Sequence, residues 1–444
     1  MILRGLRHPT RIVPLVFLAT ILVGTLLLAL PWSRAGEGAA PLLTAFFTAT
    51  SAVAVTGLIT VDTPTYWSGF GQGVILALIQ VGGFGVMAAA TLLGLLVGRG
   101  FGLSDRLITR TERGRLEFGD AAGVLKLVLM VTVVVETVIA IILTLRLRFA
   151  HGAEWGEAAW HGIFHSISAF NNAGFSTYSD SLMGFQGDGF ILLPVALAVI
   201  ITALGFPVMQ ELRARPFEWH RWTLHSKITL AGTLVLLTGG FFGILLAEWG
   251  NPDTLGPMAV GEKMLNAFFH SVMPRTAGFN SLDVGSFRVE TLSMNYLLMF
   301  IGGGSAGTAG GIKITTFFLI GIVVWSEIRG QRDPAIFGRR VGRHVERQAL
   351  SVVILAASLI MVGTLILLST TPLMLQDALF EVVSAFSTVG LSTGVTADLP
   401  PVAQLTLIVL MFVGRIGTIT IATALALSAG QVNYRYPEER PIIG

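Results

Sequence analysis

The sequence predicts an all-α membrane protein that crosses the bilayer many times. Of its 444 residues, 53% are hydrophobic and only 12% are charged, whereas soluble domains carry about 25% charged residues. Many apolar runs reach the roughly 20 residues that a helix needs to cross a bilayer. One sequence pattern recurs four times, and the basic residues gather between its copies. Together these observations predict four tandem repeats with eight spanning helices.

The recurring pattern is a half-length apolar segment that ends in a glycine. The glycines are Gly57, Gly174, Gly278 and Gly390, spaced by 117, 104 and 112 residues, and a phenylalanine stands ten residues before each one. A long apolar run lies on either side of every copy. The half-length segments are too short to cross a bilayer. We therefore interpret them as re-entrant helices that enter the membrane and turn back at the glycine.

Each repeat is expected to contain a long helix, a half-length helix, the glycine loop and a second long helix. The repeats cover residues 1–98, 99–212, 213–328 and 329–444, the last with a C-terminal tail. We expect the helices at 12–32, 40–54 and 71–98, at 121–147, 156–170 and 189–212, at 225–247, 260–273 and 292–328, and at 349–369, 374–387 and 402–428. The run at 12–32 follows arginines, as in a signal peptide, but it exceeds the about 7–15 residues of a signal's apolar core. It is interpreted as the first spanning helix.

The lysines and arginines predict the orientation in the membrane. Of the 29, 21 lie in the N-terminal segment, the segments between repeats and the tail, and six lie in the segments on the opposite side. Because positively charged loops stay in the cytoplasm, both termini are expected there, and the half-length helices enter from outside. The basic residues form no single basic face, so nucleic acid is not expected as a partner. The chain has no cysteine, which excludes disulfides and thiolate metal sites.

The four glycine loops are candidate ion-binding segments. Non-helical backbone at membrane depth is tolerated only where it is buried or lines a wet cavity. Loops that converge on one axis would place rings of carbonyl oxygens there, which can replace the hydration shell of an alkali cation. One such glycine alone is better explained as a helix cap or a packing site, but four matching copies favour a pseudo-four-fold pore. The candidate residues are Val55, Thr56, Gly57, Asn172, Ala173, Gly174, Thr276, Ala277, Gly278, Thr388, Val389 and Gly390.

A glycine-rich stretch interrupts the second long helix of repeat three. It consists of Gly302, Gly303, Gly304, Ser305, Ala306, Gly307, Thr308, Ala309, Gly310 and Gly311. Each of its six glycines costs a helix about 1 kcal/mol relative to alanine, so the helix should unwind there. A flexible linker is one interpretation. We favour a gate below the candidate ion-binding loops, because the other second long helices carry glycine at the corresponding depth, at Gly83, Gly205 and Gly414.

Several polar residues lie inside apolar runs. Arg415 interrupts the last span, where a charge is costly and suggests function. We expect it to bond to carbonyls of the 303–311 loop and to repel cations from the closed pore; a purely structural anchor is the alternative. Lys313 is expected where the interrupted helix restarts on its cytoplasmic side. Glu136 and Gln80 are expected to form hydrogen bonds between helices.

Three further polar residues lie on the half-length helices, namely His165, His270 and Glu381. They raise the alternative of an intramembrane metal enzyme. That alternative would need metal-ligand spacing, such as two histidines four apart on one helix, and these residues lack it. Arg275, beside the third loop, is expected to brace that loop's backbone.

The four half-length helices and their glycine loops resemble the Ktr/Trk/HKT superfamily of potassium transporters, and most closely its bacterial KtrB branch. The resemblance implies potassium uptake across the cell membrane, often dependent on sodium, with no cofactor held by this chain. It implies a homodimer on a cytoplasmic nucleotide-binding ring similar to KtrA. It also implies that the 302–311 loop blocks the cavity until it moves, and that the tail at 434–444 contributes to the dimer. The basic segments 99–126 and 329–347 are candidate docking surfaces for the ring.

A sodium-conducting relative is the nearest alternative. In the plant branch of the superfamily a serine in the first loop accompanies sodium transport, whereas this chain has Gly57 at that position. The resemblance therefore favours potassium.

Overall fold

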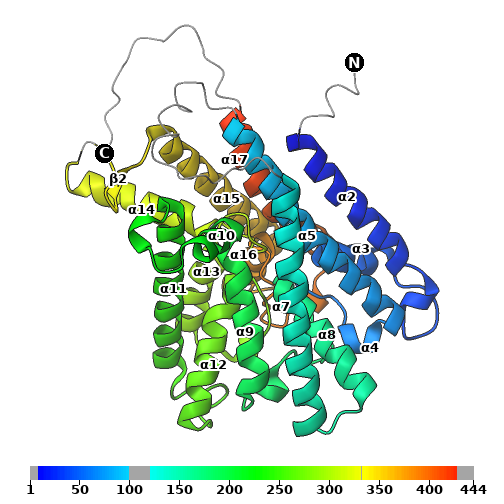
Figure 1. The fold of residues 1–444 in the computed structure, drawn as a ribbon. Helices are drawn as coiled ribbons and strands as arrows, with labels where there is room; N and C mark the ends of the chain where they lie inside the picture. Colours follow the sequence, from blue (N-terminus) through cyan, green and yellow to red (C-terminus); the bar gives the residue numbers. More distant parts are fainter. Residues whose placement is uncertain (1–8, 100–120, 332, 428–444) are drawn as a thin grey trace, which may run out of the picture.

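The computed structural model describes residues 9–99, 121–331 and 333–427, which fold almost entirely into helices (Figure 1). The first two predicted repeats contain α2 (Pro9–Leu28), α3 (Leu42–Val53), α4 (Thr63–Tyr66) and α5 (Gly69–Arg99), then α7 (Ala121–Ala150), α8 (Trp155–Asn171), α9 (Gly189–Leu204) and α10 (Phe206–Ala214). Most of the segment 99–126 and all of the tail at 434–444 lie outside the described residues.

The third and fourth predicted repeats continue the same order of elements. They contain α11 (Leu224–Glu248), α12 (Val260–Val272), α13 (Val289–Phe300) and α14 (Ile314–Ile328), then α15 (Arg343–Thr370), α16 (Leu375–Phe386) and α17 (Pro401–Leu427). Short 3₁₀ turns lie between them at Pro31–Ser33, Met183–Phe185, Trp219–Arg221, Met273–Arg275, Val284–Ser286 and Thr396–Asp398.

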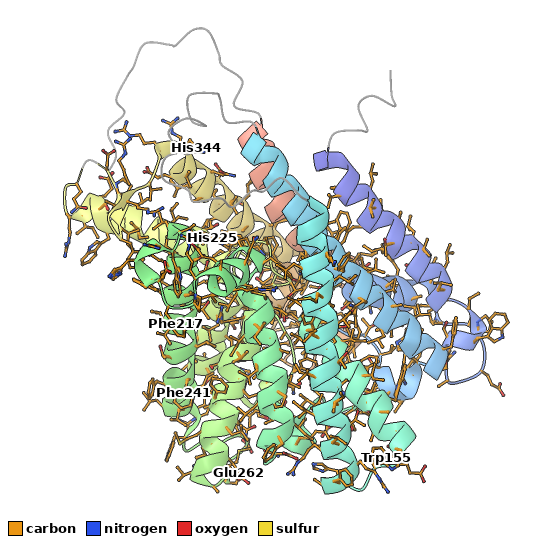
Figure 2. All side chains as sticks on the ribbon, in the orientation of Figure 1. Trp155, Phe217, His225, Phe241, Glu262 and His344 are labelled. Atoms are coloured by element: carbon orange, nitrogen blue, oxygen red, sulfur yellow. The ribbon has the colours of Figure 1, made fainter. Side chains whose placement is uncertain are left out.

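The four half-length helices form where the sequence predicts them. They are α3, α8, α12 and α16, with 12, 17, 13 and 12 residues. Figure 2 shows Trp155 and Glu262, near the starts of α8 and α12, at the opposite end of the molecule from His344 at the start of α15. These two half-length helices therefore begin at one end of the molecule and run toward its interior.

Apolar helices long enough to cross a bilayer are present. In the described ranges, three helices meet this length and composition, Lys126–Ala150, Leu224–Glu248 and Arg343–Thr370, and the bent pair α9 and α10 makes a fourth if it counts as one span. Shorter apolar helices, among them Val13–Leu28, Gly69–Gly85 and Pro401–Gly417, lie beside them. The chain has the helices of a membrane protein, and the count of eight spans remains a prediction.

The prediction of one continuous helix at 189–212 is wrong. The chain bends by 93° between α9 and α10, at Gly205. Gly205 has a φ of +86°, and a Cβ atom placed on it would lie 2.3 Å from the carbonyl oxygen of Ser305. The bend therefore makes room for the interrupted segment of repeat three, and Pro207 starts the new helix in its first turn.

The described chain also contains one small β-hairpin, which the all-α prediction did not include. Strands β1 (Ala335–Ile336) and β2 (Arg339–Arg340) pair in antiparallel register. Phe337 and Gly338 between them have φ values of 51° and 72°. Positive φ at both central residues is the geometry of the tight turns that match the twist of a hairpin.

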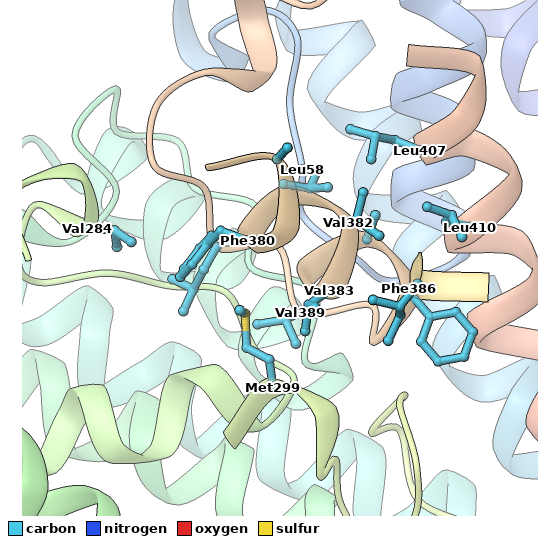
Figure 3. Packing of buried hydrophobic residues seen from close by; sticks show 14 of the residues in the cluster. Leu58, Val284, Met299, Phe380, Val382, Val383, Phe386, Val389, Leu407 and Leu410 are labelled. Atoms are coloured by element: carbon cyan, nitrogen blue, oxygen red, sulfur yellow. The ribbon is translucent and has the colours of Figure 1, made fainter. Parts of the chain in front are cut away.

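The largest buried apolar cluster surrounds α16. Figure 3 shows side chains of this half-length helix, among them Phe380, Val382 and Phe386, packed among residues from distant parts of the chain. Met299 comes from α13 and Leu410 from α17. The phenylalanine that precedes the glycine loop is fully buried in repeats one, two and four, and Phe268 is partly buried in repeat three. In repeats one, two and four this phenylalanine therefore packs the half-length helix into a buried apolar cluster.

Substitution of Gly205 tests the cause of the bend. Gly205→Ala should lower the melting temperature of the detergent-solubilised protein by several degrees. A φ of 86° with a ψ of 152° is a conformation that essentially only glycine adopts, and it costs another residue about 1–3 kcal/mol. The added methyl group also meets the Ser305 carbonyl.

Gly239 is the matched control, since a Cβ atom placed on this α11 glycine has no neighbour within 4 Å. Gly239→Ala should leave the melting temperature unchanged or raise it. Equal effects of the two substitutions would contradict this account of the bend.

Candidate ion-binding site

The four glycine loops contact one another in cyclic order. A Cβ atom placed on each glycine would collide with the backbone of the next loop: Gly57 with Ala173 O at 2.3 Å, Gly174 with Ala277 O at 2.6 Å, Gly278 with Val389 O at 2.3 Å, and Gly390 with Thr56 O at 2.0 Å. The last contact returns to the first loop, so the four contacts close a ring. Since separations under 3.0 Å essentially never occur for real Cβ atoms, only glycine fits at these positions.

The four loops share one backbone conformation. Each glycine has a positive φ, of 93°, 69°, 68° and 91° in chain order. The residue two positions before it also has a positive φ: Val55 55°, Asn172 59°, Thr276 118° and Thr388 50°. Such values are strained for residues other than glycine and persist only when the surroundings enforce them. The same strain at the same place in all four loops indicates a common requirement on the direction of their carbonyls.

Serines six positions before the glycine support this conformation. The Oγ atoms of Ser51 and Ser384 accept hydrogen bonds from the N–H groups of Gly57 and Gly390, each at 3.1 Å. In repeat two Ser168 Oγ instead donates to Phe175 O at 2.8 Å. Repeat three has Val272 at this position and continues into a 3₁₀ turn. Our sequence interpretation did not single out these serines, although their constant distance from the glycine is visible in the sequence.

Side chains also brace the loops to each other. Asn172 Nδ2 donates to Thr276 Oγ1 at 3.0 Å, and Asn172 Oδ1 accepts from Thr202 Oγ1 at 2.9 Å. Thr56 and Thr388 are fully buried, and their hydroxyl groups have no partner among the described residues. The Asn172 side chain therefore holds the loops together, whereas the two threonine hydroxyl groups remain without a hydrogen-bond partner among the described residues.

The carbonyl oxygens of the candidate residues are free of protein donors. Throughout the described ranges, no hydrogen bond reaches the backbone oxygen of Val55, Thr56, Gly57, Asn172, Ala173, Gly174, Thr276, Ala277, Gly278, Thr388, Val389 or Gly390. The non-glycine members of this set are all buried. Buried carbonyls are nearly always paired with a protein group, water or ion. Twelve unpaired carbonyls in closely packed loops therefore form a site suited to a cation.

The interrupted segment of repeat three forms an irregular loop between α13 and α14, as predicted. Its ends are joined by hydrogen bonds from Gly302 N to Ile312 O at 2.9 Å and from Ile312 N to Phe300 O at 3.2 Å. A Cβ atom placed on Gly310 would lie 1.9 Å from Thr388 Oγ1. The loop therefore touches the fourth glycine loop directly.

Two cationic side chains bind this loop, Arg415, which is buried, and Lys313, which is partly buried. Arg415 Nη1 donates to the carbonyl oxygen of Thr308, which agrees with the expected contact between this arginine and the loop. Its Nε and Nη2 atoms have no partner among the described residues. Lys313 lies at the N-cap of α14, where the helix restarts, and its Nζ donates to Ala309 O at 2.5 Å. Neighbouring carbonyls of one loop are thus held by two positive charges.

The loop also contacts the bend at Gly205. Gly304 N donates to Ala203 O at 2.7 Å, and Phe206 N, the first residue of α10, donates to Ala306 O at 3.4 Å. Further along α10, Glu211 accepts hydrogen bonds from the backbone N and Oγ1 of Thr223, both at 2.8 Å. This carboxylate anchors α10 to the start of α11. No sequence pattern predicts this contact, because it joins residues that the bend brings together.

Glycines on two second long helices pack on the half-length helices of their own repeats. A Cβ atom placed on Gly82 of α5 would lie 2.1 Å from the oxygen of Val53, the last residue of α3. A Cβ atom placed on Gly414 of α17 would lie 1.7 Å from the oxygen of Phe386, the last residue of α16. The two repeats thus hold the end of the half-length helix in the same way.

The polar residues that suggested a metal enzyme have separate partners. His165 contacts His161 O at 2.8 Å and Ser176 Oγ at 2.9 Å, whereas His270 contacts Asn295 Oδ1 at 3.3 Å. Glu381 accepts hydrogen bonds from the segment after its own glycine loop. No described contact joins any two of the three.

The prediction that Arg275 braces the third loop's backbone is wrong. Its described hydrogen bond runs from Nη2 to Thr233 Oγ1 on α11, at 3.5 Å. Among the described residues, this side chain donates no hydrogen bond to the backbone of its own loop.

The long apolar helices indicate a membrane protein, and the comparisons with known proteins specify its class. Residues 4–434 match the TrkH family model, described as a cation transport protein. The chain therefore belongs to the TrkH family of cation transport proteins. The crystal structure of the potassium transporter TrkH from Vibrio parahaemolyticus has the same fold, with a TM-score of 0.71 and 20% identity over 94% of this chain and 85% of that one.

Named relatives align along almost the whole chain. The Ktr system potassium uptake protein B of Bacillus subtilis is 38% identical over 98% of this chain and 97% of its own length. The potassium/sodium uptake protein NtpJ of Enterococcus hirae is 36% identical, with the same coverage of 98% and 97%. The Ktr system potassium uptake protein B of Vibrio alginolyticus is 34% identical over 98% and 94%.

Alanine substitutions at two glycines separate packing in the ring from backbone strain. Gly390 and Gly394 have φ values of 91° and 96°, but a Cβ atom would collide only at Gly390; at Gly394 it has no neighbour within 4 Å. Gly390→Ala should therefore lower the melting temperature well beyond the effect of Gly394→Ala. The control carries the cost of positive φ alone, about 1–2 kcal/mol. Similar melting temperatures for both variants would contradict the close contact with Thr56.

Proposed function

We propose that this protein mediates potassium uptake across the cell membrane, through the ring of glycine loops acting as a selectivity filter. The observation that carries the proposal is the set of twelve backbone oxygens without a protein donor. A potassium ion that leaves water needs its hydration shell replaced, and rings of carbonyl oxygens can do so. The C-terminal ends of the half-length helices, which precede the loops, add a negative field that favours a cation.

Potassium is favoured over sodium by Gly57, because the family resemblance implies that a serine at this position accompanies sodium transport. Relatives named as potassium uptake proteins support the same choice, while the relative named as a potassium/sodium uptake protein keeps a sodium-conducting protein as the second candidate. In this proposal potassium uptake depends on sodium, as the family resemblance implies. A metal enzyme is disfavoured because His165, His270 and Glu381 contact different segments.

We propose that the 302–311 loop is the gate, and that Arg415 and Lys313 hold it in the closed position. The loop lies against Thr388 of the fourth glycine loop, and this contact supports a role in closing the ion's path below the ring. Arg415 and Lys313 hold adjacent carbonyls of the loop and are close enough to interact electrostatically with each other. Their positive charges oppose a cation at this point. An ion passes when the loop leaves the path.

The membrane arrangement follows the charge pattern of the sequence. We propose that both termini are cytoplasmic and that the protein works as a homodimer on a cytoplasmic ring of nucleotide-binding subunits. Relatives that are named as part of a Ktr system support a multi-subunit assembly. The segments 99–126 and 329–347 would dock the ring, and the β-hairpin of β1 and β2 lies within the second of these segments.

Growth of a potassium-uptake-deficient bacterial strain at micromolar-to-millimolar potassium tests the function. The chain, expressed with its regulatory partner, should restore growth, and the purified protein in liposomes should carry potassium in preference to sodium. Gly390→Ala supplies the negative control, because it disrupts the ring. Absence of rescue with the partner present would reject the proposal, and equal fluxes of the two ions would favour the sodium-conducting alternative.

Arg415→Ala tests whether Arg415 holds the 302–311 loop in the closed position. A hydrogen bond from a charged group contributes about 1.5–3 kcal/mol, so its loss should raise the open fraction by about tenfold or more. We expect faster potassium uptake at low stimulus, measured as flux into liposomes without the activating nucleotide.

The matched control is Arg221→Ala, which removes an exposed arginine that pairs with Glu218 at 2.9 Å, outside the proposed docking segments. It should leave the unstimulated flux unchanged. An unstimulated flux of Arg415→Ala equal to that of wild type would contradict the proposal that Arg415 holds the loop closed.

A further inference from the structure

Carboxylates inside the described helical body differ in how well their charge is satisfied. Glu381 accepts three hydrogen bonds, from Ser392 Oγ at 2.6 Å, Thr396 Oγ1 at 2.6 Å and Thr393 N at 3.1 Å. Glu248 accepts four, from the side chains of Asn251, Thr254 and Thr291 and from the backbone of Arg288. Both side chains are fully buried. Their donors stabilise the ionised form.

Glu136 has no comparable set of donors. It lies in the middle of α7, and its oxygens receive one contact from Gln80 Nε2 at 3.5 Å and one from Asn171 Nδ2 at 3.4 Å. Both separations are at the long limit for a hydrogen bond. This agrees with the expected hydrogen bond between Glu136 and Gln80, yet it leaves the carboxyl group poorly satisfied as an anion.

The surroundings of Glu136 are apolar and uncharged. Val133, Val134 and Val138 on the same helix are exposed on the face that would meet lipid. The interactions of Glu136 among the described side chains are with the two amides and with no charged group. An ionised carboxylate without a partner is costly at membrane depth, and such residues mark functional sites.

The titratable groups on neighbouring elements are engaged elsewhere. α7 packs against α5, α8 and α9. Arg146 of α7 binds Asp188 at the cap of α9, at 2.8 Å. Lys126 and Arg148 lie ten and twelve residues from Glu136 along α7.

The titratable groups of α8 also have other partners. Glu157 lies 3.7 Å from His161, and His165 bonds to Ser176. Among the side chains described on α5 and within α9, none is titratable.

Asn171 connects Glu136 to the ring of glycine loops. It is the last residue of α8, next to Asn172 of the second loop, and it is fully buried. Its Nδ2 donates to Gln80 Oε1 at 2.8 Å as well as to Glu136, while its Oδ1 has no hydrogen-bond partner among the described residues. A Cβ atom placed on Gly83 would lie 1.9 Å from that Oδ1, so the amide fits tightly between α5 and α7.

We propose that Glu136 is a proton-binding site within the membrane, and that its protonation acts on the second glycine loop through the Asn171 amide. The ligand is a proton rather than a metal cation, because the two nearest groups present N–H donors to the carboxyl oxygens. A metal cation would need acceptor oxygens there. When protonated, the carboxyl O–H can donate to Gln80 Oε1, which already accepts from Asn171. When ionised, the carboxylate draws both amides toward it, which changes how the end of α8 is held.

Infrared spectroscopy tests proton binding without reference to transport. The full-length protein in lipid nanodiscs is titrated between about pH 5 and about pH 9, the range in which buried carboxyl groups titrate. The C=O band of a protonated carboxyl group should grow as the pH falls in wild type, and this component should be lost in Glu136→Gln. The control is Glu154→Gln, an exposed carboxylate at the cap of α8 without a capping bond, which should retain it. Identical titrations of wild type and Glu136→Gln would overturn the proposal.

A second variant covers the case in which Glu136→Gln fails to fold. Gln80→Leu removes a donor that favours the ionised form, so the same band should remain and its midpoint should move to higher pH. An unchanged midpoint would count against the site.

The effect on the loops rests on the proposed function and is read as potassium flux into liposomes. Wild-type flux should change with pH at the midpoint of the infrared band, and Glu136→Gln should keep the low-pH wild-type flux at every pH. A Glu136→Gln flux with the wild-type pH profile would overturn the coupling. Absence of flux from wild type would instead reject potassium transport and leave the infrared result to decide proton binding.

Discussion

The structure depends on the close approach of four glycines to the backbones of neighbouring loops. At 2.0–2.6 Å from a carbonyl oxygen, a Cβ atom cannot be accommodated at any of these positions. The absence of side chains lets the loops meet backbone to backbone, and it leaves their carbonyl oxygens without protein donors. Half-length helices, supporting serines and a buried phenylalanine in three of the repeats then hold each loop in a conformation that most residues would resist.

The 302–311 loop, which we propose as the gate, lies directly against this ring. The 302–311 loop touches the fourth glycine loop at Thr388, the bend of α9 and α10 at Gly205, and the positive charges of Arg415 and Lys313. Glycines allow the contacts with both backbones, and the two cations hold carbonyls that an unwound helix leaves free. Glu211 anchors α10 to α11. A displacement of α10 would therefore move the 302–311 loop without first moving the ring of glycine loops.

The elements that recur in the chain can be predicted from the sequence, whereas features that depend on a single tertiary contact cannot. The half-length helices and the glycine loops recur four times, so their pattern is readable from the chain alone, and so is the unwound segment with its six glycines. Arg415 was noticed because charge is rare in an apolar span. The bend at Gly205 was missed because a single glycine and a proline are tolerated in membrane helices. The hydrogen bond of Arg275 to α11 was missed because it joins residues 42 positions apart in the chain.

The central claim is that the ring of loops binds potassium. Crystals or grids prepared with thallium or rubidium in place of potassium test it most directly, since heavy ions that replace potassium are located independently of the protein. The account predicts ion density enclosed by the carbonyls of residues 55–57, 172–174, 276–278 and 388–390, weakened by competing potassium more than by sodium. Heavy-ion density elsewhere in the protein, with none inside the ring, would contradict it.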